Sequence, residues 1–118
     1  MVHKHRLKKS LKHAFRGVGI AFRTEQSFRI QLIAGVFVII LMLVLRVSLS
    51  HAILLLLLIG AVLVLELINS IFERLVDVFK PRIHPIVGEI KDIMAGAVLV
   101  ASVASAIIGA LIIIPYLV

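Results

Sequence analysis

Long apolar runs alternate with short polar breaks along this chain of 118 residues. About 20 consecutive apolar residues are enough for a helix to cross the hydrocarbon core of a bilayer. The pattern therefore predicts membrane helices over residues 30–48, 52–77 and 91–115. Only a few polar residues separate the first two, so we expect these two helices to form an antiparallel hairpin.

Residues 1–29 have a different pattern, in which apolar and basic positions interleave at helical spacing. The apolar positions are Leu7, Leu11, Ala14, Phe15, Val18 and Phe22, and the basic positions between them include Lys8, Lys9, Lys12, Arg16 and Arg23. This arrangement is typical of an amphipathic helix that lies in the headgroup plane. A secretory signal peptide fits poorly, because the basic region is too long and no clear cleavage site follows. Glu25 and the many lysines also disfavour a mitochondrial presequence.

Composition indicates a membrane protein. The chain is 62% hydrophobic and its mean hydropathy is +1.19, which is too apolar for a soluble domain of this length. We expect one all-α integral membrane domain over residues 1–118. The absence of cysteine excludes disulfides, Cys-ligated zinc and a thiol nucleophile. The net charge of +7 suggests nucleic acid at first, but eight of the 13 Lys and Arg residues precede Ile30. Contact with anionic headgroups explains that cluster more simply, so we expect no nucleic-acid partner.

The distribution of Lys and Arg also predicts the topology. Eight lie in the N-terminal segment and four between Arg74 and Lys91, whereas the first hairpin turn has only Arg46 and the C-terminal tail has none. The positive-inside rule therefore places the N-terminus and the Arg74–Lys91 segment in the cytoplasm. Three spans then put the C-terminus outside. The acidic end of the second predicted helix emerges on the cytoplasmic side, where ATP is found.

That acidic end is the strongest candidate for a site. Glu66, Asn69, Glu73 and Asp77 follow steps of three, four and four residues, which places them on one face of a helix. An ionisable group surrounded by hydrocarbon costs roughly 2.5–3.5 kcal/mol on insertion scales, so its default interpretation is functional. The alternative is a frayed helix end whose acids reach up to water, and it explains Glu66 alone better than the whole stripe.

The acidic residues together suggest phosphate chemistry. All six lie in or beside the predicted cytoplasmic half: Glu25, Glu66, Glu73, Asp77, Glu89 and Asp92. Carboxylates from two elements suit Mg²⁺, and a desolvated carboxylate can take a proton from a lipid hydroxyl. Lys91, Arg82 and the basic N-terminal segment can neutralise phosphates. No Walker A or protein-kinase Gly-rich loop is present, so any nucleotide site is of another type. His84 is a candidate ligand, although a solvated loop histidine is the simpler interpretation.

Three motifs resemble those of one family. Residues 66–77 resemble the signature E-x-x-N-[ST]-x-x-E-x-x-x-D of the prokaryotic diacylglycerol kinases. Residues 21–29 resemble the family's stretch ending in E-x-x-F-R, and residues 88–92 resemble its G-x-x-K-D, which a small-residue run over 95–99 follows. The motifs keep the family's order and spacing over nearly the whole chain. The resemblance implies a small trimeric kinase, multi-pass in the bacterial inner membrane, that is unrelated to soluble lipid kinases and has its active site on the cytoplasmic side.

The resemblance also implies roles for individual residues. Glu66 takes the position of the general base, and Glu25 and Glu73 take those of the acids linked to Mg²⁺. The implied nucleotide contacts are Arg6, His13, Glu25, Asn69, Glu73, Arg82, His84, Gly88, Lys91 and Asp92. The implied lipid contacts are Phe28, Arg29, Glu66 and Ala95, with Ser70 and Asp77 in supporting positions. The implied partners are ATP, a membrane lipid and further copies of the chain in a homotrimer.

Departures from the family pattern bear on which lipid is phosphorylated more than on whether phosphate is transferred. Gln31 stands where diacylglycerol kinases of the Gram-negative type have an acid. Ile71 and Phe72 replace a smaller Ala-Ile pair, and His13 replaces an aromatic nucleotide contact. The Phe-Arg-Ile stretch, the His84-Pro85 pair and the Ala-Gly-Ala-Val-Leu run resemble the undecaprenol kinase branch more closely. We therefore expect undecaprenol as acceptor, with diacylglycerol as the alternative.

Two other classes of function stay open from the residues alone. A small proton-coupled transporter would use Glu66 as a midplane proton carrier, but the acids cluster at one end and Glu66 is only about two turns from the cytoplasmic edge. A structural membrane protein would use the small residues Ala97, Ala101, Ser105 and Gly109, which recur every four residues and let another helix approach. It gives no reason for the acidic face. The resemblance makes an ATP- and Mg²⁺-dependent lipid kinase the leading hypothesis.

Overall fold

The computed structural model describes residues 3–79 and 85–118, which form four helices and contain no strand. In chain order they are α1 (Lys4–Thr24), α2 (Gln26–Val44), α3 (Leu49–Val78) and α4 (Pro85–Leu117). The last three are each long and apolar enough to cross a membrane. The expected architecture, an N-terminal helix followed by three membrane helices, is therefore confirmed.

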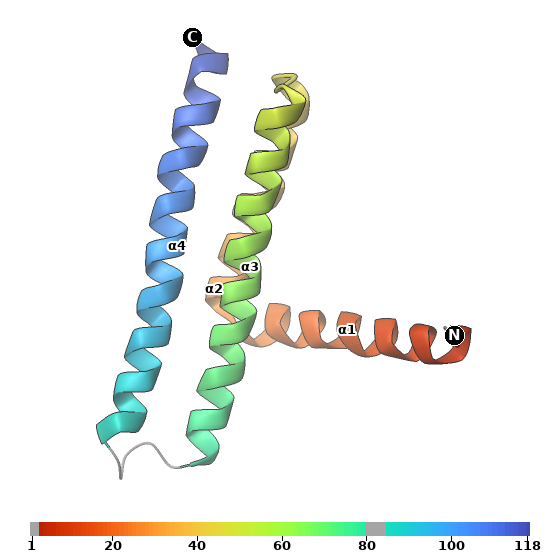
Figure 1. The fold of residues 1–118 in the computed structure, drawn as a ribbon, viewed down its shortest axis with the longest axis vertical. Helices are drawn as coiled ribbons and strands as arrows, with labels where there is room; N and C mark the ends of the chain where they lie inside the picture. The colour runs from red at the N-terminus through yellow and green to blue at the C-terminus, as the bar shows by residue number, and fades with distance from the viewer. Residues whose placement is uncertain (1–2, 80–84) are drawn as a thin grey trace.

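The three spans run alongside one another, and α1 leaves them at a steep angle (Figure 1). In this view α2 lies behind α3, and α1 extends sideways so that the N-terminus is far from the spans. The C-terminus and the α2–α3 turn are at one end of the bundle, and the chain passes from α3 to α4 at the other. This is the geometry of a helix lying on a bilayer that the other three cross. Its large apolar side chains, including Leu7, Leu11, Phe15 and Phe22, are exposed, as immersion in the interface requires.

Helix boundaries depart from the sequence pattern at α4. The pattern suggests an irregular segment as far as Glu89, because Pro81, Pro85 and Gly88 interrupt it, whereas the structure shows helix from Pro85 onward. Proline is tolerated at the first position of a helix, since its missing N–H would have no intrahelical partner there. The first turns of α4 therefore carry Gly88 on a regular helix.

The end of the bundle that contains the C-terminus is held by an apolar cluster and a polar link. Met42, Leu55, Ile112 and Ile113 form the buried cluster. Beside it, the Tyr116 hydroxyl oxygen accepts a hydrogen bond from the Ser48 backbone N–H at 3.1 Å and lies 2.8 Å from Nδ1 of His51. This packing ties α4 to the α2–α3 turn and leaves the opposite end of the bundle for the acidic residues.

Close approach of α2 and α3 depends on Gly35. A Cβ at this position would lie 2.8 Å from Cγ2 of Ile59, so the Ile59 side chain or one of the two helices would have to shift. We expect Gly35→Ala to lower the free energy of unfolding by about 1–3 kcal/mol, as overpacking does. Denaturant titration in mild detergent measures this change. Gly60→Ala is the control, because a Cβ there meets no atom within 4 Å. Equal stability of the two variants would contradict the prediction.

Candidate active site

Glu25 lies at the junction of α1 and α2 with an extended backbone (φ −113°, ψ 107°). Its N–H donates to the Ala21 carbonyl at 2.8 Å, and its own carbonyl accepts from the Arg29 N–H at 3.2 Å. Glu25 is the N-cap residue of α2, a position where Ser, Thr, Asp and Asn commonly bind the first N–H groups of a helix with their side chains. Glu25 makes no such bond. Its Oε1 instead accepts a hydrogen bond from the Ser70 hydroxyl of α3 at 3.0 Å.

Arg74 completes this contact between the α1–α2 junction and α3. Its Nη1 lies 3.1 Å from Oε1 of Glu25, and its Nη2 donates to the Thr24 hydroxyl at 3.0 Å. Nη1 also donates to the Ser70 hydroxyl. Sequence reasoning missed this role and counted Arg74 only in the charge balance. A signal was present, because Glu66, Ser70 and Arg74 recur every four residues and so share one helix face.

Glu66 is buried on the same face of α3, with only 6% of its surface exposed. Glu25 meets this face at Ser70, which lies between Glu66 and Glu73 in the sequence. No hydrogen bond or ion pair joins Glu66 to another residue in the part of the chain that the structure describes. The structure thus brings the predicted base and the two predicted metal-linked acids together, from α3 and the α1–α2 junction.

Asn69 and Glu73 continue this group toward the C-terminal end of α3. The Asn69 Nδ2 donates to Oε1 of Glu73 at 3.3 Å. The Asn69 Oδ1 is buried and has no partner among the described residues. An unsatisfied buried acceptor costs about 1–3 kcal/mol. It therefore calls for a donor from outside the described residues, such as water, a bound ligand or a second copy.

The donor set fits Mg²⁺ better than a metal held by protein alone. Within residues 3–79 and 85–118, no group of three or more His, Cys, Asp and Glu residues could hold a metal ion. Mg²⁺ is usually bound through one or two carboxylates, with waters and substrate phosphates supplying the other oxygens. Glu25 and Glu73 match the protein's share of that set, and Asn69 Oδ1 adds an oxygen without a partner.

Lys91 on α4 is held by Asp77, the last acid of the α3 face. Its Nζ lies 3.0 Å from Oδ1 of Asp77, and the two side chains are 37% and 62% exposed. An exposed ion pair of this kind contributes only about 0–1 kcal/mol, so Lys91 can exchange its partner for a phosphate at little cost. Asp92 and Ala95 are exposed and Gly88 is half-buried in the same turns. Arg82 and His84, both predicted nucleotide contacts, lie outside the described residues.

Arg6 and His13 are not brought to the acids within one chain. Both are exposed on α1, about 28 Å and 18 Å from Glu25 along the helix at its usual rise. Figure 1 shows that α1 leads away from the spans toward its N-terminus. Neither residue lies beside the acids in this chain, and their roles as nucleotide contacts stay predictions.

Two predicted lipid contacts have structural partners in this chain. Phe28 is only 3% exposed and belongs to the core. Arg29 Nη1 donates to the carbonyls of Phe22 and Arg23 at 2.9 Å and 3.0 Å. These are among the last carbonyls of α1, which have no partner within the helix, and basic side chains commonly bind them. Both residues therefore stabilise the α1–α2 junction, whatever they contact besides.

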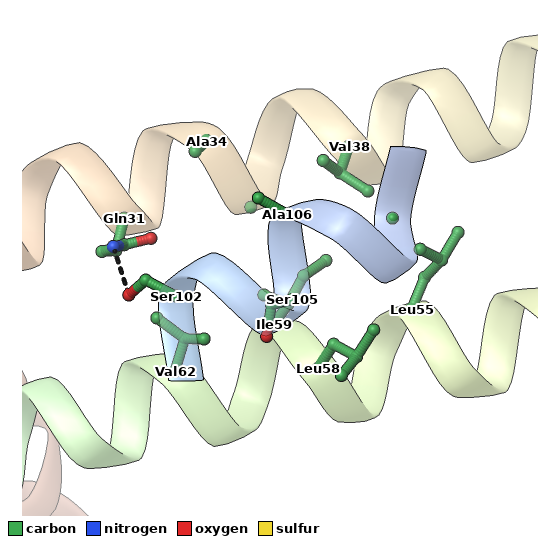
Figure 2. Close-up of a pocket in the computed structure, with 12 residues that line it drawn as sticks. Gln31, Ala34, Val38, Leu55, Leu58, Ile59, Val62, Ser102, Ser105 and Ala106 are labelled. Atoms are coloured by element: carbon green, nitrogen blue, oxygen red, sulfur yellow. Dashed lines mark hydrogen bonds between the residues drawn. The ribbon is translucent and has the colours of Figure 1, made fainter. Parts of the chain in front are cut away.

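A cavity of about 230 Å³ lies between α2, α3 and α4, farther from the C-terminal end of α3 than the acids. Most of its lining is apolar, and Gln31 and Ser102 face each other across one end of it (Figure 2). Gln31 Nε2 donates to the Ser102 hydroxyl at 3.0 Å. Gln31, one of the departures from the family pattern, therefore links two membrane helices. Ser105 and Gly109 of the small-residue stripe also line this cavity, so at least half of that stripe serves packing within the chain.

A second hollow, of about 480 Å³, lies between α1 and α3. Small or apolar residues line most of it, namely Ala14, Gly17, Val18, Ile20, Ala21, Leu67 and Ile71. Its polar lining consists of Ser70 and Arg74, the two residues that bind Glu25. An apolar groove therefore ends at the acidic group, and Ile71, another departure, forms part of its wall.

Comparison with known proteins gives consistent matches over this region. The family described as prokaryotic diacylglycerol kinase matches residues 12–113. Undecaprenol kinase of Bacillus subtilis is 39% identical over 113 residues, which cover 96% of this chain and 92% of that protein. Diacylglycerol kinase of Synechocystis is 36% identical over 107 residues, which cover 90% of this chain and 61% of that protein. Every predicted site residue except Arg6 falls within the family match.

Proposed function

The chain belongs to the prokaryotic diacylglycerol kinase family and is a membrane lipid kinase, and from this premise we propose that it transfers the γ-phosphate of ATP to undecaprenol. The observation that carries the acceptor is the 39% identity to an undecaprenol kinase across 96% of the chain. The Synechocystis relative supports diacylglycerol as the second candidate. Both acceptors present a hydroxyl at the membrane surface, so the chemistry is the same.

In the proposed reaction the oxygen of the lipid hydroxyl forms a bond to the γ-phosphorus. The bond between that phosphorus and the oxygen bridging to the β-phosphate breaks, and ADP leaves with the bridging oxygen. Glu66 takes the hydroxyl proton as general base. Its burial and its lack of a partner among the described residues support this role, because a base near the lipid has to be free to accept a proton.

Electrostatic stabilisation of the phosphates is the second requirement. Mg²⁺, when bound with ATP, supplies positive charge that offsets the charge on the transferring phosphoryl group. Glu25 and Glu73 are the residues proposed to hold it. Lys91 is proposed to bind phosphate after leaving Asp77, and the exposure of that ion pair supports such an exchange.

The groove between α1 and α3 is the proposed site for the lipid chain. Its wall is apolar and its polar lining is Ser70 and Arg74. A lipid lying there with its hydroxyl toward these residues would present the hydroxyl to the acidic group. Gly17 in the wall makes room, because nothing lies within 4 Å of the place where its Cβ would be.

Location and assembly follow from the same proposal. The asymmetry of Lys and Arg supports an active site on the cytoplasmic side of a bacterial inner membrane. The distance of Arg6 and His13 from the acids and the unsatisfied Asn69 Oδ1 support a site completed by another chain, and we propose a homotrimer. Mass measurement of the active enzyme in detergent is expected to give three copies, and an active monomer would contradict the assembly.

An acceptor assay tests the proposed function. The purified protein is given γ-labelled ATP, Mg²⁺ and either undecaprenol or diacylglycerol in mixed micelles. We expect labelled undecaprenyl phosphate to form with at least about tenfold higher kcat/KM, a difference of roughly 1.4 kcal/mol in transition-state stabilisation. A preference for diacylglycerol would make diacylglycerol the acceptor in place of undecaprenol. Labelling of neither lipid would refute the proposal.

The same assay in sealed vesicles tests the location of the site. ATP added outside inside-out vesicles is expected to support labelling. ATP added outside right-side-out vesicles is expected to do so only after permeabilisation. The reverse result would place the site on the other side of the membrane.

A further inference from the structure

We propose that Arg74 is a positioning residue, which holds Glu25 against α3 so that one of its two carboxylate oxygens stays available to the reaction. Nothing in the sequence motifs assigns Arg74 a role, since it falls on a variable position of the signature. The inference rests on the proposed function for its catalytic consequence. Its structural part concerns the angle between α1 and the spans and can be tested separately.

One guanidinium connects three residues on two sides of the α1–α2 junction. Nη2 binds Thr24, the last residue of α1, at 3.0 Å, and Nη1 binds Glu25 at 3.1 Å and the Ser70 hydroxyl. The Thr24 hydroxyl donates in turn to the Ile20 carbonyl at 2.7 Å, which fixes it to α1. Arg suits this task because its planar group presents several donors in fixed directions, whereas Lys presents one compact charge.

The hydrogen bonds to the Glu25 side chain all fall on one oxygen. Arg74 and Ser70 both bind Oε1, and within the described residues no side chain or backbone group binds Oε2. Arginine often binds a carboxylate through both oxygens at once, which would occupy Glu25 entirely. The observed arrangement holds the side chain in place and leaves Oε2 for a ligand that is not part of the protein.

The contact between Arg74 and Glu25 orients Glu25 more than it stabilises the fold. The side chains of Arg74 and Glu25 are 49% and 26% exposed, and ion pairs with this exposure contribute little to folding. Glu25 is the N-cap residue of α2, and its side chain makes no hydrogen bond to the N-terminus of that helix. The contacts with Arg74 and Ser70 thus hold Glu25 against α3 beside Ser70, which lies between Glu66 and Glu73 in the sequence.

Kinetics test the catalytic part with Arg74→Met, Arg74→Lys and a matched control, Arg46→Met. Arg46 is an exposed cation of the α2–α3 turn, at the other end of the bundle from the acids, and makes no ion pair with any described residue. Arg74→Met is expected to lower kcat about 10–100-fold, as loss of a residue that orients a metal ligand does. It should raise the Mg²⁺ concentration for half-maximal rate and leave the KM for the lipid nearly unchanged. Arg74→Lys should recover part of the loss, because it keeps the charge but cannot reach Thr24 and Glu25 together. Arg46→Met should behave as the parent.

A distance measurement tests the structural part without turnover. The chain has no cysteine, so spin labels can be placed at Lys8→Cys on α1 and Leu57→Cys on α3, both exposed positions. Labelled protein is diluted into unlabelled copies so that only distances within a chain are recorded, in the absence of ATP and Mg²⁺. Arg74→Met is expected to shift or broaden the distance distribution, and Arg74→Lys and Arg46→Met should change it less.

Three results would overturn the inference. An unchanged distance distribution together with reduced kcat would make Arg74 a substrate contact. Unchanged kinetics and distances in Arg74→Met would remove it from the site. If Arg74→Met reached its half-maximal rate at a lower Mg²⁺ concentration than the parent, the guanidinium would be competing with the cation for Glu25. If the parent protein phosphorylates neither lipid, the proposed function fails, whereas the distance measurement still decides whether Arg74 holds the junction.

Discussion

Glu66→Gln is expected to yield a protein that inserts, assembles and binds Mg·ATP but transfers phosphate about 10²–10⁴ times more slowly. That loss corresponds to roughly 3–5 kcal/mol of transition-state stabilisation. Glutamine keeps the shape of the side chain and removes the basic oxygen. Because Glu66 makes no bond to another described residue, the substitution breaks no described contact that holds the fold.

The depth of Glu66 is the physical reason for assigning it the base rather than a metal ligand. It lies seven residues before Glu73, which is about two turns or roughly 10 Å deeper along α3. At that depth it is buried and near the position expected for a lipid hydroxyl, whereas Glu73 is nearer the aqueous phosphates. A base benefits from desolvation, and a ligand of Mg²⁺ has to stay ionised.

Turnover and nucleotide affinity have to be measured side by side for this variant. Glu89→Gln is the matched control, because Glu89 is an exposed acid of α4 to which no role is assigned. Unchanged turnover in Glu66→Gln would exclude the general base. An equal loss of nucleotide affinity would make Glu66 a binding or structural residue.

The membrane helices and the acidic face could be predicted from sequence because both are local patterns. A run of apolar residues long enough to span is recognisable without tertiary information, and the period of a helix places Glu66, Asn69 and Glu73 on one face. The Mg²⁺-linked role of Glu25 came from the resemblance alone. Residue spacing cannot bring a junction residue to a helix that begins 24 residues later, and only the packing of α1 and α2 against α3 does so.

The contacts that sequence reasoning missed depend on packing between segments. Arg74 binds Thr24 and Glu25 across about 50 residues of sequence, and no pattern within α3 identifies those partners. The pairing of Lys91 with Asp77 likewise depends on how α3 and α4 meet. The early start of α4 at Pro85 does not depend on packing between segments, because proline is common at the first position of a helix. Sequence reasoning missed this start because the segment is polar.

Glu73→Gln is expected to keep the fold but to lower Mg²⁺-dependent turnover by a factor on the order of 100 or more, a larger effect than loss of a residue that only orients a ligand. The Asn69 Nδ2 donates to its Oε1, and a glutamine carbonyl oxygen can still accept that bond, so the local structure should persist. What is lost is the negative charge that holds a hard cation. A Mg²⁺ titration of the rate is the measurement, with Glu89→Gln again as control. We expect a shift of half-saturation to higher Mg²⁺ together with a reduced maximum. If Glu73→Gln retains near-normal activity and an unchanged Mg²⁺ dependence, Glu73 does not belong to the metal site. Its carboxylate on the Glu66 face of α3 would then have another role.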